Sequence, residues 1–121
     1  MTEPGQAPAA EELIDDIERG RFELRRDGEA VGWLQYNRLK PNRYALQHTQ
    51  VETRHQHQGV AGAMVRQVLD EIRGRGGTIT AICPFVVDFL SKSPAYADLV
   101  DGRHPGYTDR AAAEAAAAGL P

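Results

Sequence analysis

The stretch from Tyr44 to Cys83 constrains the fold of this chain more than any other part of the sequence. Residues 59–73 carry apolar side chains on one helical stripe and polar side chains on the other, which predicts an amphipathic helix. The flanking segments, Tyr44–Val51 and Thr78–Cys83, are short and rich in β-branched or small apolar residues, which predicts strands. Two strands joined through a helix are expected to be parallel, because the helix returns the chain to the end of the sheet at which the first strand began. We therefore expect a parallel strand pair with a helix packed on it.

The segment before this unit predicts antiparallel strands. Phe22–Arg25 alternates apolar and polar residues, and Ala30–Tyr36 returns as its partner. Asp27 and Gly28 lie between them and tolerate the positive φ angles of a two-residue hairpin turn. The next turn is predicted at Lys40–Asn42.

Two further points concern the faces and the edge of this sheet. Alternation along Tyr44–Val51 assigns side chains to two faces. One face holds Tyr44, Leu46 and His48, and the other holds Ala45, Gln47, Thr49 and Val51. Residues 11–20 leave two interpretations open, a short helix or an edge strand beginning near Ile14.

A second, shorter helix is predicted after the last strand. Pro84 is suited to a first helical turn, and Pro94 ends the apolar pattern that follows. The predicted order is hairpin, strand, strand, helix, strand, helix. The fold class is therefore α+β, with a mixed and mostly antiparallel sheet, a central parallel strand pair and packed helices.

Length and composition restrict the class of protein. The 121 residues suffice for one domain, and no apolar run approaches the roughly 20 residues of a membrane-spanning helix. The net charge is −3, with six acidic residues and one basic residue in the first 20 positions, and no dense basic stripe suggests nucleic-acid binding. Cys83 is the single cysteine, which excludes an internal disulfide, and the start of the chain lacks the pattern of a signal peptide. We expect a cytoplasmic protein.

The glycine-containing segment Gln56–Gly62 is the first candidate for a binding site. It lies between a predicted strand and the strongest predicted helix, and small residues leave the first helical turn accessible. The unpaired N–H groups of that turn attract an anion such as a pyrophosphate. Small residues at a helix start also serve packing alone, so the segment by itself leaves both interpretations open. It matches neither a Walker loop nor the Gly-x-Gly-x-x-Gly dinucleotide pattern.

Four segments of the chain together resemble a known family. They are Gln56-x-x-Gly59-x-Ala61, His48-Thr49-Gln50-Val51, Cys83-Pro84-Phe85-Val86 and Pro94-Ala95-Tyr96-Ala97-Asp98-Leu99-Val100. The first is similar to the acyl-CoA motif of the GNAT superfamily of N-acetyltransferases, and together they resemble its short YjdJ-type domain. The resemblance covers residues 14–103. It divides the chain into a flexible leader at 1–13, the YjdJ-type N-acetyltransferase domain at 14–103, and an Ala-rich tail at 104–121 that is disordered or a frayed helix.

The resemblance implies a GNAT-like fold that binds acetyl-CoA as cosubstrate. The main chain around the helix start would hold the CoA pyrophosphate, and the main chain of Val51 would pair with the pantetheine arm between splayed parallel strands. The implied cofactor-binding residues are Val51, Gln56, His57, Gln58, Gly59, Val60, Ala61, Gly62 and Ala63. The sequence departs from the family pattern at Gln56, where Arg is more common, and at Gln50, where the short family has Glu. The first change removes a positive charge from the phosphate site, and the second removes a carboxylate base.

Three residues are candidates for catalysis. Cys83 precedes a helix that starts with proline, where a thiol is activated for nucleophilic attack; it could accept the acetyl group, line the pocket, or be a buried small residue. His48 is a candidate general base, or a satisfied histidine of the sheet. Tyr96 is a candidate acid for the leaving thiolate, or a hydroxyl that anchors the core. His55, His57, His48 and Cys83 lack the spacing of a metal site, so no metal is predicted.

The predicted function is an N-acetyltransferase that moves an acetyl group from acetyl-CoA to an unidentified amine, on a small molecule or a protein, with possible assistance from Cys83. The alternative is an acyl-CoA-binding module without efficient catalysis. An interaction protein without a nucleotide ligand is a third reading, which leaves the glycine segment at Gly59 unexplained. Neither nucleic acid nor a membrane is an expected partner.

Overall fold

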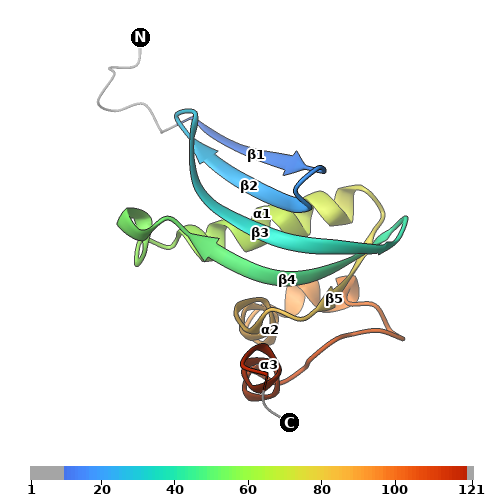
Figure 1. Ribbon diagram of the computed structural model, residues 1–121. Coiled ribbons are helices and arrows are strands. Elements are labelled where there is room, and N and C mark those ends of the chain that lie inside the picture. The colour runs from blue at the N-terminus through green and yellow to red at the C-terminus, as the bar shows by residue number, and fades with distance from the viewer. Residues whose placement is uncertain (1–9, 120–121) are drawn as a thin grey trace.

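The computed structural model describes residues 10–119 and forms a single five-stranded sheet with helices against it (Figure 1). The strands are β1 (Glu11–Asp16), β2 (Arg21–Arg26), β3 (Glu29–Lys40), β4 (Arg43–Val51) and β5 (Thr78–Ala81), and they lie side by side in chain order. Each of the strands β1 to β4 pairs antiparallel with the next one in the chain, and β5 pairs parallel with β4. The predicted α+β class and the parallel strand pair are confirmed, but the pair lies at one end of the sheet rather than at its centre.

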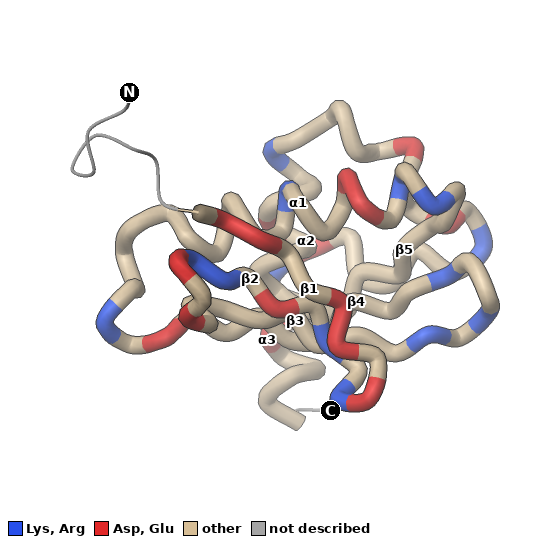
Figure 2. The backbone as a smooth tube through the Cα atoms, turned by 90° about the horizontal axis from the view of Figure 1, so that it is seen from above, with Lys and Arg blue, Asp and Glu red and all other residues tan. Residues whose placement is uncertain are grey.

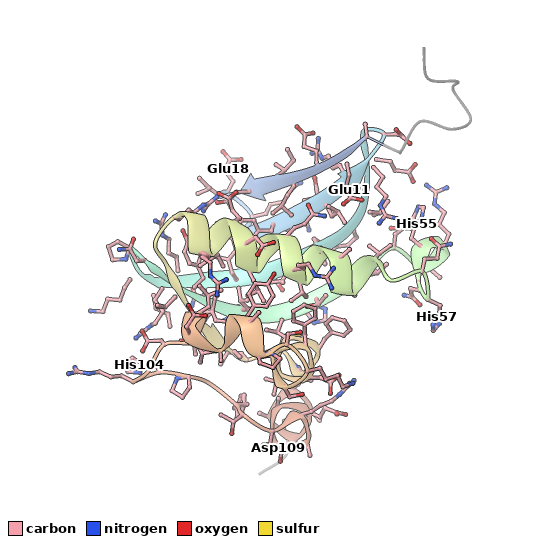
Figure 3. All side chains as sticks on the ribbon, turned by 180° about the vertical axis from the view of Figure 1, so that it is seen from behind. Glu11, Glu18, His55, His57, His104 and Asp109 are labelled. Carbon is pink, nitrogen blue, oxygen red and sulfur yellow. The ribbon has the colours of Figure 1, made fainter. Side chains whose placement is uncertain are left out.

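The helices are α1 (Val60–Gly74), α2 (Pro84–Ser91) and α3 (Arg110–Ala117), with short 3-10 turns η1 (Thr53–His55) and η2 (Pro94–Leu99). In Figure 1, α1 lies behind β2 and β3, and Figure 3 shows it in front when the molecule is seen from behind. Its apolar stripe is buried against the sheet, as the sequence predicts. No helix in the described part of the chain is long and apolar enough to cross a membrane.

The first hairpin forms as predicted. Asp27 and Gly28 have φ angles of 52° and 80°, so both central residues of the turn are left-handed. The ambiguous segment before it is an edge strand, because β1 pairs along its whole length with β2. The sheet therefore starts at Glu11, within the segment expected to be a leader. Residues 1–9 lie outside the described residues.

A polar cluster fixes this edge strand to the rest of the fold. The Tyr36 hydroxyl donates a hydrogen bond of 2.6 Å to Asp15 on β1. Arg75, just after α1, donates to the same carboxylate at 2.9 Å and to the Tyr44 hydroxyl at 3.1 Å. Burial, followed by the bond to Asp15, raises the pKa of Tyr36 above its ordinary value. These long-range contacts, rather than local propensity, select the strand for residues 11–16.

The charges are distributed unevenly over the surface. Acidic residues gather along β1, whereas Lys and Arg are spread over several other elements (Figure 2).

The C-terminal segment differs from the expected disordered or frayed tail. Residues 100–107 run along the outer edge of β5, where Val100 and Gly106 form parallel bridges with Ile79 and Ala81. The N–H of Tyr107 donates to the carbonyl of Ala81 at 2.8 Å. Helix α3 follows and packs on α2, so it gains the tertiary burial that an isolated alanine-rich helix lacks. Residues 120 and 121 lie outside the described residues.

Replacing Gly106 with alanine is expected to destabilise the protein by about 2–4 kcal/mol. Gly106 has a φ angle of 80°, and a Cβ atom there would overlap the main chain of Ala81. The free energy of unfolding from chemical denaturation measures the loss. Gly102→Ala is the matched control, because a Cβ at that position meets open space. Equal stability of the two variants would contradict the pairing of this segment with β5.

Candidate functional site

The parallel strand pair separates after a short ladder. β4 and β5 pair from Arg43 opposite Thr78 to Leu46 opposite Ala81, and no later pair joins them in the described sheet. At that point the carbonyl of Leu46 accepts hydrogen bonds from the N–H groups of both Ile82 (3.0 Å) and Cys83 (2.8 Å). The chain then enters α2 while β4 continues to Val51. The second half of β4 thus has an edge that β5 does not cover.

The direction of the main-chain groups on this edge follows from the pairing with β3. The N–H of Glu52 donates to the carbonyl of Val31 on β3 at 2.8 Å. Successive residues of a strand direct their N–H and C=O groups to opposite edges. Val51 therefore directs both groups away from β3, and so does Thr49, two residues earlier. The edge offers donors and acceptors at the spacing of an extended partner.

A β-bulge in β4 corrects the predicted arrangement of side chains. Leu46 pairs with Tyr36 and His48 pairs with the preceding residue of β3, Gln35, which leaves Gln47 as an extra residue. An extra residue reverses the alternation beyond it. The prediction that His48 shares a face with Leu46 is therefore wrong, and the side chain of His48 is exposed.

Thr49 takes the place that alternation had assigned to His48. Its Oγ1 atom lies 3.3 Å from the Sγ atom of Cys83, a hydrogen bond that joins β4 to the start of α2. The earlier placement of Thr49 and Val51 on the face of Ala45 and Gln47 does not hold beyond the bulge. Thr49 was missed as a site residue because no local pattern signals its contact with Cys83.

Cys83 is almost fully buried, with 3% of its surface exposed. It is the N-cap residue of α2 and has extended backbone angles, with Pro84 as the first residue of the helix. Its thiol makes no capping hydrogen bond with the first turn of α2. The side chain instead contacts Thr49, at the point where β4 and β5 separate. Cys83 therefore precedes a helix that starts with proline, as the sequence predicts.

A hollow of about 400 Å³ lies at the start of α1, beside the end of β4. The residues that line it are Val51, His55, Gln56, His57, Gly59, Val60, Ala61, Gly62 and Phe85. It brings together most of the residues expected to bind a cofactor, whereas Gln58 and Ala63 are not among those lining it. Figure 3 shows His55 and His57 at this end of the molecule, beyond the first turn of α1.

The main chain at the start of α1 has N–H groups that no side chain caps. Gly59 is the N-cap residue with a φ angle of 77°, and no side chain caps the helix. The first helical hydrogen bond runs from the N–H of Ala63 to the carbonyl of Gly59, at 3.1 Å. The N–H groups of residues 60–62 precede it and lie at the positive end of the helix dipole. The hollow therefore has the features of a phosphate-binding site.

Two side chains in the hollow refine the sequence-based expectation. Gln56 does not extend outwards as a simple phosphate ligand, because its Nε2 atom donates to the carbonyl of Val51 at 3.2 Å. The Nε2 atom of His55 is buried and has no hydrogen-bond partner within the protein. The sequence pattern offers His55 only as a metal ligand. Within residues 10–119, no group of three or more His, Cys, Asp or Glu side chains is placed to hold a metal ion.

Tyr96 does not belong to this hollow. Its hydroxyl donates to the carboxylate of Asp70 on α1 at 2.8 Å, and its ring lies 6.1 Å from that of Phe89. Burial, followed by the hydrogen bond to Asp70, raises the pKa of Tyr96. These contacts correspond to the anchoring alternative, since the hydroxyl fastens η2 to α1.

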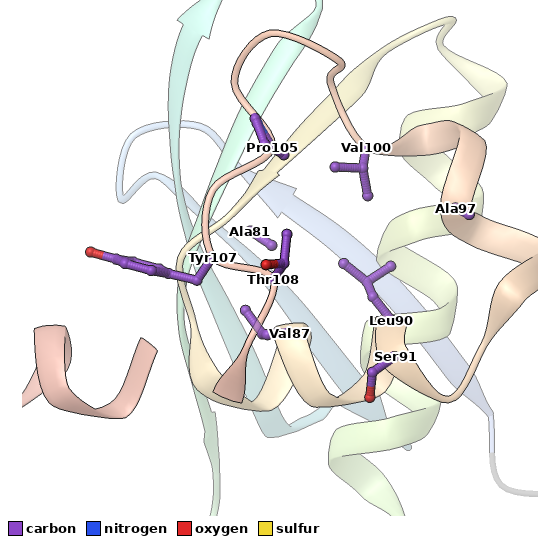
Figure 4. A pocket seen from close by; sticks show the side chains of 9 residues that line it. All are labelled: Ala81, Val87, Leu90, Ser91, Ala97, Val100, Pro105, Tyr107 and Thr108. Atoms are coloured by element: carbon purple, nitrogen blue, oxygen red, sulfur yellow. The ribbon is translucent and has the colours of Figure 1, made fainter. Parts of the chain in front are cut away.

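A second hollow of about 220 Å³ lies between α2, η2 and residues 105–108 (Figure 4). Its lining is mainly apolar, from residues such as Val87, Leu90 and Val100, and also includes Ser91, Tyr107 and Thr108. It lacks the start of α1 and the imidazole and amide side chains of the first hollow. The first hollow is therefore the candidate site.

Comparison with known proteins adds the family. The sequence matches the model of the GCN5-related N-acetyl-transferase family over residues 21–99. The chain belongs to this family. The match spans β2 to η2 and so contains the separated strands, the hollow and Cys83. No match was found among curated protein sequences.

One solved structure shows the same fold for this GNAT-family chain, and others are similar over part of it. The solution structure of a GCN5-like protein from Staphylococcus aureus is 22% identical, with a TM-score of 0.56 over 79% of this chain and 96% of that one. Ard1 from Thermoplasma volcanium is 16% identical, with a TM-score of 0.44 over 51% of this chain and 43% of that one. A GNAT-family protein from Desulfovibrio desulfuricans is 23% identical, with a TM-score of 0.43 over 50% of this chain and 41% of that one. The chain spans less than half the length of the last two.

Proposed function

We propose that this protein is an N-acetyltransferase of the short, YjdJ-type kind, which transfers the acetyl group of acetyl-CoA to an amine. The observation that carries the proposal is that the hollow at the start of α1 adjoins the uncovered edge of β4. The hollow at the start of α1 includes Val51, and Val51 also belongs to the edge of β4 that β5 leaves uncovered. A cofactor with a diphosphate and an extended amide-containing arm matches both features. The acceptor is an amine on a small molecule or on a protein.

The diphosphate would lie against the N–H groups at the start of α1, where Gly59 leaves room for it. The pantetheine arm would run along β4 towards Cys83 as an extra strand, because its amides match the main-chain groups of Thr49 and Val51. The thioester would then lie near the Thr49–Cys83 pair, where the strands separate. The absence of a capping side chain on α1 supports this placement, since those N–H groups would otherwise be satisfied internally.

Cys83 supports a two-step route. In the first step the sulfur of Cys83 attacks the acetyl carbonyl, the bond between that carbon and the CoA sulfur breaks, and the thiol proton passes to the departing CoA thiolate. In the second step the amine attacks the acetyl-cysteine, the carbon–sulfur bond to Cys83 breaks, and an amine proton restores the thiol. In the alternative route the amine attacks the thioester directly and Cys83 lines the site. His48 faces solvent on the other side of β4, so we assign it no step.

Gly59→Glu is expected to abolish CoA binding, with an affinity loss of about 100-fold or more, because bulk and negative charge would enter the diphosphate site. Isothermal titration calorimetry with CoA measures the loss. Gly28→Glu is the matched control, because Gly28 has a similar φ angle of 80° and open space around it, but lies in the β2–β3 turn. Both variants carry the strain of a left-handed non-glycine residue, and only the first should lose CoA. Unchanged affinity in Gly59→Glu would disprove the site.

Incubation with acetyl-CoA is expected to add one acetyl group to the wild-type protein, detected by intact-mass spectrometry, and no acetyl group to Cys83→Ala. Thr49→Val removes the hydroxyl that contacts the thiol and should slow acetylation by about 10-fold, whereas Thr49→Ser should retain most of the rate. CoA affinity should stay the same in both Thr49 variants. A wild-type protein that releases CoA only when an amine is added, without ever carrying the acetyl group, would establish direct transfer instead. No amine-dependent release would favour an acyl-CoA-binding module.

A further inference from the structure

The side chain of Gln56 occupies a main-chain acceptor that the proposed cofactor needs. Its Nε2 atom donates to the carbonyl of Val51, at 3.2 Å. That carbonyl points away from β3, because the neighbouring residue Glu52 uses its own N–H for the bond to β3. The carbonyl is thus the last acceptor on the edge along which the pantetheine arm would run. An extended ligand on that edge would offer it an amide N–H, the same kind of donor that Gln56 supplies.

We propose that Gln56 is an affinity-determining residue that competes with the arm of the ligand for the Val51 carbonyl. The proposal rests on the proposed function, since it assumes that CoA lies along β4. Both Gln56 and Val51 line the hollow, so the amide of Gln56 lies in the path between the diphosphate site and the strand edge. The Gln56 side chain must leave Val51 before an amide of the arm can donate there at good geometry. The protein thereby gives up part of the binding energy of the arm.

The competition lowers the affinity contributed by the arm of the ligand. It leaves the affinity contributed by the nucleotide and the diphosphate unchanged. Breaking the Gln56–Val51 bond lowers the observed affinity for any ligand that uses the Val51 carbonyl. A ligand that contains only the nucleotide and the diphosphate does not need this carbonyl. A direct contact between Gln56 and a phosphate would instead affect both ligands equally. The ratio of the two affinities therefore isolates the competition from any phosphate contact.

The test compares CoA with 3′-phosphoadenosine 5′-diphosphate, which retains the diphosphate and lacks the pantetheine arm. Dissociation constants for both are measured by calorimetry on the full chain. Gln56→Ala is expected to raise the preference for CoA over the arm-less nucleotide by about five-fold, the value of one neutral hydrogen bond. Gln56→Met keeps the length of the side chain without a donor, and should show a similar increase. Gln35→Ala, an exposed glutamine on β3, is the matched control and should leave both affinities unchanged.

An unchanged or smaller preference for CoA in Gln56→Ala overturns the proposal. An increase in Gln56→Ala but not in Gln56→Met also overturns it, because bulk rather than the hydrogen bond would then be responsible. If the wild-type protein binds neither ligand, the proposed function itself fails. If it binds both and the preference does not respond to Gln56, only this inference fails.

Discussion

The carbonyl of Leu46 is the point on which the arrangement of the site depends. By accepting hydrogen bonds from both Ile82 and Cys83, it ends the parallel ladder and ties the chain that leaves β5 to a single position on β4. A continued ladder would consume the main-chain groups of Thr49 and Val51. Because the ladder stops, β4 keeps those groups available while β3 still holds it in the sheet. An open strand edge inside a folded domain is thus obtained without loss of the core.

The bulge at Gln47 is the second feature on which the site depends. It changes the face of the sheet on which the following side chains lie. A regular strand would direct His48 towards Cys83 and Thr49 towards the other face. The extra residue exchanges the two, so that a hydroxyl group contacts the buried thiol and the imidazole lies in solvent. The same strand therefore presents main-chain groups on its edge and a hydroxyl at the start of α2.

The sequence predicts the features that local chemistry determines. The Asp27–Gly28 turn, the apolar stripe of α1 and the proline at the start of α2 follow from residue type and spacing, and so does the parallel pair. Residue type and spacing do not predict the face on which His48 lies, because a bulge is a property of the register between two strands. The edge strand β1 is chosen by the contact of Asp15 with Tyr36 and Arg75, which lie far along the chain. The C-terminal segment likewise becomes ordered because it pairs with β5, and an alanine-rich sequence does not reveal that pairing.

Helices α1, α2 and α3 differ in whether a side chain caps the N–H groups of the first turn. The two helices without such a cap are those next to the candidate site. Helix α3 is capped by its own Asp109, whose carboxylate accepts from the N–H of Ala111 at 3.1 Å. Helices α1 and α2 begin at Gly59 and Cys83, and neither residue supplies a capping side chain. Phe85, in the first turn of α2, lines the same hollow as Gly59. The positive end of the α1 dipole raises the potential of this hollow, which His55 and His57 also line. This accounts for how a chain with Gln rather than Arg at position 56 could still attract a diphosphate.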